Sequence, residues 1–169
     1  MSDVIVALER SRAAVDEFLA TTDRCADVWT IPTAPGKWSP SQIVEHIAIA
    51  LEESATQISG GPSQLPRFPG FLRPVARTLF FNKVLRNSAF PKAKAAKVLH
   101  PAAGPATPAD ARVRLRSALE KFDRACRSRV ATARNFQHSV FGTVSVADYA
   151  RFQELHVRHH RKQLPGVGG

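Results

Sequence analysis

The amino-acid sequence predicts an all-α fold, a bundle of four principal helices with one short accessory helix. In four long segments the apolar residues recur at intervals of three and four, the spacing of one face of an α-helix. Three of these segments follow residues that commonly begin helices. No stretch alternates apolar and polar residues over a useful length for a strand. With 169 residues, the chain fits a single domain spanning 1–169.

The first helix is expected over residues 3–21. Its apolar stripe consists of Ile5, Leu8, Val15, Phe18 and Leu19. A connector with Pro32, Pro35 and Gly36 interrupts regular structure after it. The chain is therefore expected to pass through a loop before the second helix begins.

The second helix is announced by Ser39-Pro40-Ser41-Gln42, which fits a capping box. Proline at the first helical position does no harm, because that residue needs no N–H donor. The apolar side of this helix consists of Ile43, Ile47, Ala50, Leu51 and Ile58. His46 falls on the same side and is expected to point into the interior.

The remaining helices follow a break at 60–70. Residues 71–87 predict a short, apolar and basic accessory helix, and 91–108 predict a long surface connection with at most a broken helical turn. Thr107 is expected to cap a helix that ends near residue 133. A loop over 135–144 leads to Ser145, which caps the last helix, ending at Leu164 before Pro165-Gly166.

Composition and charge limit the function classes. No apolar run approaches the roughly 20 residues that span a bilayer, and the N-terminus becomes charged too early for a signal peptide, so a cytoplasmic protein without a membrane partner is expected. The net charge is +10, and residues 67–134 hold 16 Lys or Arg against three acids. Such a segment could attract an anion, although solvated helix faces look the same. Cys25 and Cys126 match no metal or redox spacing and are interpreted as structural thiols.

Half of the six histidines lie within five positions, at His156, His159 and His160. Residues four apart on a helix project from one face, so His156 and His160 can offer nitrogens to one divalent ion. Tyr149, Phe152, His156, His160 and Gln163 follow one inward stripe, and His159 lies at its edge. Alternatively, this cluster is a solvated basic tail.

A third inward imidazole is available at His46, if the second and last helices are neighbours. Three neutral histidines leave a coordination position open for water or substrate, the pattern of reactive metal sites. The alternative for His46 is a hydrogen-bonded core histidine. Gln163 could orient a ligand or close the helix end. Glu45 and Glu154 lie beside these histidines in sequence but point elsewhere on their helices. Arg73 and Arg77 are weak candidates for binding a carboxylate.

Two stretches resemble the motifs of the DinB-like superfamily. "PGKWSPSQIVEHI" is similar to the superfamily's second-helix motif, and "HSVFGTVSVADYARFQELHVRHHRKQLPG" resembles its end, with a Phe-Gly turn and a His-x-x-His-His-x-x-Gln arrangement. The resemblance covers nearly the whole chain. The proline-rich connection between the two motifs also resembles that of an uncharacterised branch of the superfamily.

The resemblance implies an up-down-down-up four-helix bundle with a long crossover, often a homodimer. It implies a divalent metal held by His46, His156 and His160, with His159 as a hydrogen-bonding neighbour. Gln163, Trp38 and Tyr149 are expected beside the ligands or in the pocket. Zinc and nickel are the leading candidates, but the sequence does not identify the metal, because imidazole suits copper and iron as well. The leading function is a metal-dependent thiol transferase or hydrolase acting on a small molecule, with a low-molecular-weight thiol as one partner.

Two other functions stay open. One is a non-catalytic module that binds a metal or a small molecule. The other is an anion-binding protein that uses the basic segment 67–134. Nucleic acid is an unlikely partner, and the superfamily's name, which refers to DNA damage, does not imply that its members bind DNA. Affinity through that segment should fall steeply with salt, whereas metal chemistry should not.

Overall fold

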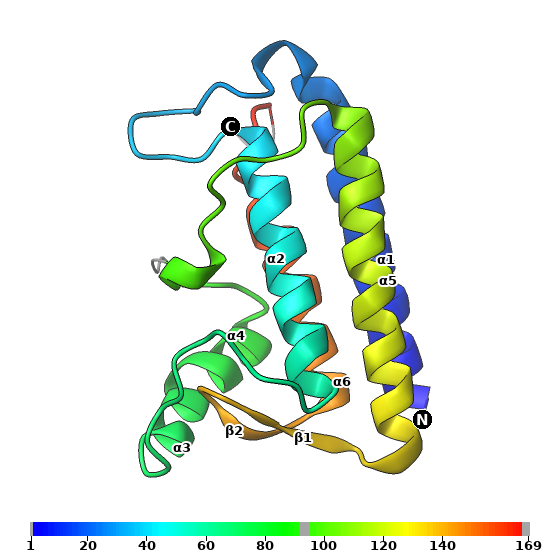
Figure 1. Ribbon diagram of the computed structural model, residues 1–169, viewed down its shortest axis with the longest axis vertical. Coiled ribbons are helices and arrows are strands. Elements are labelled where there is room, and N and C mark those ends of the chain that lie inside the picture. Colours follow the sequence, from blue (N-terminus) through cyan, green and yellow to red (C-terminus); the bar gives the residue numbers. More distant parts are fainter. Residues whose placement is uncertain (1, 92–94, 167–169) are drawn as a thin grey trace.

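The computed structural model describes residues 2–91 and 95–166, and it is mostly helical (Figure 1). The long helices are α1 (Ser2–Thr22), α2 (Pro40–Ile58), α5 (Pro108–Thr132) and α6 (Val146–Arg161). α2 packs along α5, and α1 packs along α6. In Figure 1, α1 and α6 run in one direction and α2 and α5 in the other. The prediction of a helical fold with four long helices is therefore confirmed.

Three helices begin at the predicted caps. The hydroxyls of Ser39, Thr107 and Ser145 each accept a hydrogen bond from the backbone N–H three residues later. At Ser39 the capping box is complete, because the Gln42 side chain also accepts from the Ser39 N–H. Each cap stabilises its helix by about 1 kcal/mol. These starts set which residues of α2 and α6 face the interior.

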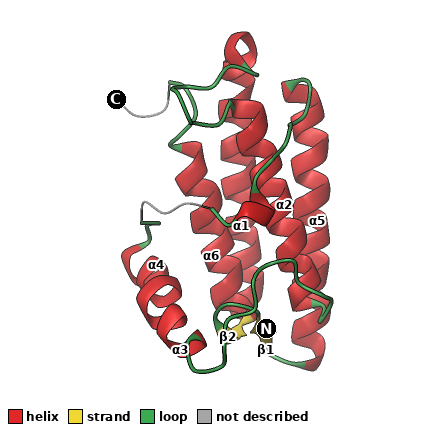
Figure 2. Ribbon diagram, turned by 60° about the vertical axis from the view of Figure 1, so that its left-hand side comes forward, coloured by secondary structure: helices red, strands yellow, loops and turns green. Residues whose placement is uncertain are grey.

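The accessory helix is also present, with a different internal structure. It runs through α3 (Arg73–Ala76), the π-helical turn η2 (Arg77–Phe81) and α4 (Asn82–Asn87). It ends at Ser88, whose φ of 49° is left-handed. α4 packs against α6, so this segment stands beside one edge of the bundle (Figure 2).

The connection between the accessory helix and α5 is hydrogen-bonded to the bundle. It contains the predicted broken turn, the 3₁₀ helix η3 (Lys97–Leu99), while 92–94 lie outside the described residues. The Pro105 carbonyl accepts hydrogen bonds from Trp29 Nε1 at 2.8 Å and Ser41 Oγ at 2.7 Å. This connection is therefore fastened to the start of α2.

The prediction of a loop over 135–144 and of no strands is wrong. Strands β1 (Asn135–His138) and β2 (Gly142–Ser145) form an antiparallel hairpin in which Phe136 pairs with Val144. Each strand has only four residues, too few for its alternating burial to stand out in the sequence. A second element was missed as well, the 3₁₀ helix η1 (Asp23–Val28) after α1. The hairpin closes the end of the bundle where α2 ends and α6 begins (Figure 1).

The buried apolar side chains form one cluster that draws on all four long helices, the accessory helix and the hairpin. Its largest fully buried members include Phe18, Phe122, Leu51 and Leu115. Within residues 2–91 and 95–166, no helix combines the length and the apolarity needed to cross a membrane. The core thus fixes α2 and α6 on either side of the site described next.

Candidate metal centre

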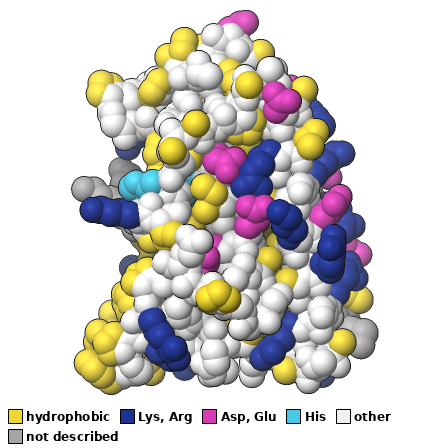
Figure 3. Space-filling view, viewed as in Figure 1, with side chains coloured by type: hydrophobic (Ala, Val, Ile, Leu, Met, Phe, Trp, Pro, Cys, Tyr) yellow, Lys and Arg dark blue, Asp and Glu magenta, His cyan; other side chains and the backbone are white. Residues whose placement is uncertain are grey.

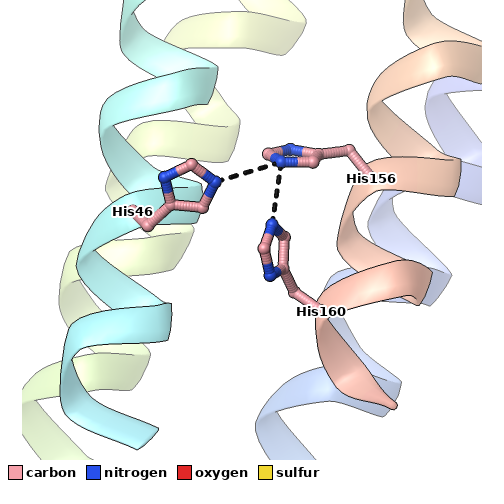
Figure 4. A group of neighbouring side chains, drawn as sticks. All are labelled: His46, His156 and His160. Carbon is pink, nitrogen blue, oxygen red and sulfur yellow. Dashed lines mark hydrogen bonds between the residues drawn. The ribbon is translucent and has the colours of Figure 1, made fainter. Parts of the chain in front are cut away.

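Imidazoles from two helices meet at one point in the interior. The Nε2 atoms of His46 on α2 and His156 on α6 lie 3.2 Å apart, and those of His156 and His160 lie 3.0 Å apart (Figure 4). His46 and His160 are buried, at 1% and 7% exposed, and His156 is partly buried. Each residue offers a ring nitrogen, and all three nitrogens lie within 4.8 Å of one another. The structure therefore brings together the three residues proposed from sequence as ligands.

In His46 and His160, the hydrogen bond of the outer ring nitrogen, Nδ1, fixes the tautomer. His46 Nδ1 lies 2.8 Å from the Leu99 carbonyl oxygen of η3, which can only accept a hydrogen bond. His160 Nδ1 lies 2.9 Å from Gln163 Oε1, and the Gln163 amide nitrogen points to His159 Nε2 at 3.0 Å. Both rings thus carry the proton on Nδ1 and turn the lone pair of Nε2 toward the centre.

A cation bound between these nitrogens would stabilise the lone pairs that face one another. His46 and His160 both direct an acceptor at His156 Nε2, which carries at most one proton and can satisfy only one of them. Burial and the neighbouring imidazoles lower the pKa of His156 well below its usual range, and they lower the pKa of His160 to about 3. At neutral pH the three rings are therefore uncharged, and where their Nε2 atoms meet, at least two lone pairs face at most one proton. A shared metal ion satisfies all three.

The spacing of the nitrogens also fits a metal. Two nitrogens bound to one tetrahedral zinc ion at about 2.0–2.1 Å lie about 3.3 Å apart. The two distances of 3.0 and 3.2 Å that His156 Nε2 makes with the other nitrogens are close to this value. Three imidazoles, with outer hydrogen bonds to Leu99 and Gln163, make a set suited to zinc, nickel, copper or iron.

Comparison with known protein families agrees with this geometry. The model of the DinB superfamily matches residues 7–164, nearly the whole chain, including both helices that carry the histidines. The protein belongs to the DinB superfamily. The resemblance noted in the sequence is thereby confirmed. Searches of curated proteins and of solved structures gave no significant match.

In this DinB superfamily protein the histidines line a cavity of about 850 Å³ between α2, α6, the hairpin and the connection. A volume of this size is ordinary for a small-molecule site. The four other predicted residues, Trp38, Tyr149, His159 and Gln163, also line it. Trp38 packs on the His46 ring with a centroid distance of 4.6 Å. Gln163 bonds to two histidines, which favours its ligand-orienting role over helix closure.

Other predicted residues lie away from this cavity. Arg73 donates to the Phe68 carbonyl and Arg77 to the Thr143 carbonyl, and neither lines the cavity, so their proposed role in binding a carboxylate is not supported. Glu45 binds Arg114, and the buried Glu154 pairs with Arg151 and Arg158. As expected, both carboxylates point away from the histidines.

Sequence reasoning missed several residues of the DinB cavity. Its apolar wall contains Phe80 and Phe90, and its far end contains Ser54, His138 and Gln153. Ser54 and Gln153 could have been found, because each lies on the inward face of its helix at helical spacing from a histidine. Phe90 and His138 could not, because their positions depend on how a connection and a short hairpin fold back.

Neither cysteine is available as a nucleophile. Cys25 and Cys126 are free, fully buried thiols, as the sequence predicted, and neither lines the cavity. Burial raises the pKa of Cys126 to about 12, which keeps it protonated and unreactive. A thiol nucleophile in any reaction at this site must therefore come with the ligands.

His138, at the base of the cavity, predicts a pH dependence of stability. Burial lowers its pKa to about 4, so the unfolded chain, with a histidine pKa of about 6.5, takes up the proton first as the pH falls. The stabilisation from neutral His138 is complete above pH 6.5 and is lost between about 6.5 and 4. Urea unfolding at pH 7 and pH 4.5 should show about 2–3 kcal/mol less loss in His138→Gln than in wild type. Equal losses in both proteins would contradict the burial effect.

Proposed function

We propose that this protein is a divalent-metal-dependent enzyme that joins a low-molecular-weight thiol, or water, to an electrophilic small molecule. Zinc or nickel is the proposed ion, and His46, His156 and His160 are its proposed ligands. The observation that carries the proposal is the convergence of three neutral imidazoles on the wall of a cavity of small-molecule size. We also infer that the four long helices form the up-down-down-up bundle with a long crossover, which their directions in Figure 1 support.

A divalent ion at this site would act as a Lewis acid and lower the pKa of a thiol or water that binds to it. The protein's own residues would bind and orient the reactants. Trp38 and His159 flank the histidines, and the phenylalanines of the cavity wall exclude water from the reacting groups. Exclusion of water strengthens electrostatic interactions inside the site.

The one carboxylate among the described residues that line the cavity is held by hydrogen bonds. Glu53 lines the cavity, but its Oε1 accepts hydrogen bonds from Gln57, Ser63 and the Gln64 backbone. These three donors hold the carboxylate in one orientation. Activation of the nucleophile by a metal, rather than by a carboxylate base, is consistent with this arrangement.

The test is a turnover assay with metal-loaded protein. Cysteine or glutathione is incubated with an epoxide or an activated aryl chloride, and loss of the free thiol is followed. An ester of 4-nitrophenol tests the hydrolase alternative. The proposal predicts turnover that is lost on chelation and in His156→Ala. Binding of metal without turnover of any thiol or ester would favour the alternative of a non-catalytic binding module.

The basic segment 67–134 gives less support to anion binding than its sequence suggests. Five of its basic residues form ion pairs with acids of α1, η1, α2 or α5: Arg112, Arg114, Arg116, Lys121 and Arg127. Acidic and basic side chains accordingly alternate over α2 and α5 (Figure 3, right half). This mixture favours the interpretation of solvated helix faces.

Two expectations stay predictions. The homodimer is supported by apolar side chains of the accessory segment, since Phe71, Val75 and Leu79 are 77%, 50% and 68% exposed. α3 lies at the lower left of Figure 1, and hydrophobic surface gathers at the same place in Figure 3. Exposed apolar patches of this kind mark contacts with other molecules. The cytoplasmic location has no further support beyond the sequence.

A further inference from the structure

One buried acceptor in the cavity has no partner. Gln153 lies on α6, one helical turn before His156, and is 4% exposed. Its Nε2 donates to Ser54 Oγ at 3.0 Å, while its Oε1 is the buried side-chain polar atom without a hydrogen bond among the described residues. An unsatisfied buried acceptor costs stability, so it is uncommon unless a ligand uses it.

The orientation of the Gln153 amide follows from a chain of hydrogen bonds that begins in the hairpin. The backbone N–H groups of Val140 and Phe141 both donate to His138 Nδ1, at 3.1 and 3.2 Å. That nitrogen is therefore unprotonated. Because burial keeps the ring neutral, with a pKa of about 4, the proton sits on His138 Nε2 and is donated to the Tyr149 hydroxyl at 3.1 Å.

The chain continues to Ser54. Tyr149 accepts from His138, so its own proton points to Ser54 Oγ at 3.2 Å. The Ser54 proton goes to the Ala50 carbonyl at 2.6 Å, since a carbonyl can only accept. Ser54 Oγ thus has no proton left for Gln153 and can only accept from its amide nitrogen. A flipped amide would place two acceptors against each other, so Oε1 must be the unpaired atom.

The surroundings of this acceptor are mostly aromatic, and Glu53, the one carboxylate among the described residues that line the cavity, lies near Tyr149. Phe80 and Phe152 line the same cavity, and Phe90 contacts both Phe152 and the His156 ring in tilted arrangements, at centroid distances of 4.8 and 5.4 Å. Burial raises the pKa of Tyr149 to about 12, so the phenol stays neutral. The cavity therefore joins the three histidines to a single neutral acceptor along a wall of aromatic rings.

We propose that Gln153 Oε1 binds an N–H or O–H donor on the ligand, and that the ligand's flat apolar part lies against Phe80, Phe90 and Phe152. This deepens the proposed function by assigning the substrate's class, and it rests on that function only for the identity of the cavity as the active site. The donor would lie within one or two helical turns, about 5–11 Å, of the histidine nitrogens. An anionic group is disfavoured at this end, where Glu53 is the one carboxylate among the described residues that line the cavity.

The test uses two probes of nearly the same shape, indole with an N–H donor and benzofuran without one. Their dissociation constants are measured by ligand-observed NMR titration of the full-length protein. Wild type should bind indole at least about tenfold more tightly than benzofuran, because benzofuran leaves Oε1 unpaired. In Gln153→Met and Gln153→Leu this preference should disappear, with benzofuran binding unchanged or tighter.

Melting temperature separates ligand binding from a structural role. If Gln153 served only the fold, both variants would melt lower than wild type. The proposal predicts an unchanged or higher melting temperature, since each variant removes the unpaired acceptor. Equal affinity of wild type for both probes, binding of neither probe, or an indole preference that survives in both variants would each overturn it.

The result is independent of metal chemistry. Neither probe has a thiol or a charge, so the titration is repeated with chelator-treated wild type and with His156→Ala. The indole preference should persist in both, because Gln153 does not contact the histidines. If wild type showed neither bound metal nor turnover but kept the indole preference, the proposed function alone would be refuted. Loss of the preference with metal binding intact would refute the Gln153 site alone.

Discussion

The His156→Ala protein is expected to bind zinc more than about a hundredfold more weakly than wild type. Loss of an outer hydrogen-bonding partner alone weakens metal affinity by about 10–100-fold, and this change removes a ligand. His156 Nε2 also lies between the other two nitrogens, so His46 and His160 would be left without the atom that links them. Metal per chain, from elemental analysis after dialysis against buffered zinc, measures the effect.

The stability of His156→Ala gives a second readout, because the difference from wild type should change sign between zinc and chelator. Zinc at about 100 times its dissociation constant should stabilise wild type by about 2.7 kcal/mol and His156→Ala hardly at all. With a chelator and no metal, by contrast, the variant should be at least as stable as wild type, because the substitution removes the repulsion between the Nε2 lone pairs of the three histidines. His100→Ala is the matched control, since His100 is an exposed histidine at the cavity whose ring hydrogen-bonds, among the described residues, to the Ala95 carbonyl and not to the three histidines. Equal zinc content in wild type and His156→Ala would end the ligand assignment.

Gly104→Ala is expected to destabilise the protein by at least about 2 kcal/mol and to weaken metal binding. A Cβ at Gly104 would lie 2.1 Å from the Ser41 carbonyl oxygen, which is backbone and cannot swing aside. The connection would have to move off α2, and the hydrogen bonds of Pro105 to Trp29 and Ser41 would break. The same connection supplies the Leu99 carbonyl that orients His46.

Urea unfolding and zinc titration measure the two effects of Gly104→Ala. Gly70→Ala is the matched control, because a Cβ there has nothing within 4 Å and its φ is not left-handed. That variant should stay within about 1 kcal/mol of wild type. Unchanged zinc affinity in Gly104→Ala, with the control behaving normally, would contradict the role given to the connection.

The helices and the three histidines could be predicted because their signals are local. Capping residues and apolar periodicity set where α2 and α6 begin and which faces are buried, and these faces carry His46, His156 and His160. The sequence could not give the partners behind the ligands, because Leu99 reaches His46 through a connection with no periodic pattern. The hairpin escaped prediction since its four-residue strands are defined mainly by pairing with each other. Thus His138, and with it the orientation of Gln153, depended on long-range contacts.

The most direct test of the shared cation is a crystal structure of the zinc-loaded protein with an anomalous difference map at the zinc edge. The account predicts one strong peak about 2.0–2.1 Å from the Nε2 atoms of His46, His156 and His160, with a further position open toward the cavity. A map with zinc bound elsewhere, or with the His46 ring turned away from α6, would contradict it.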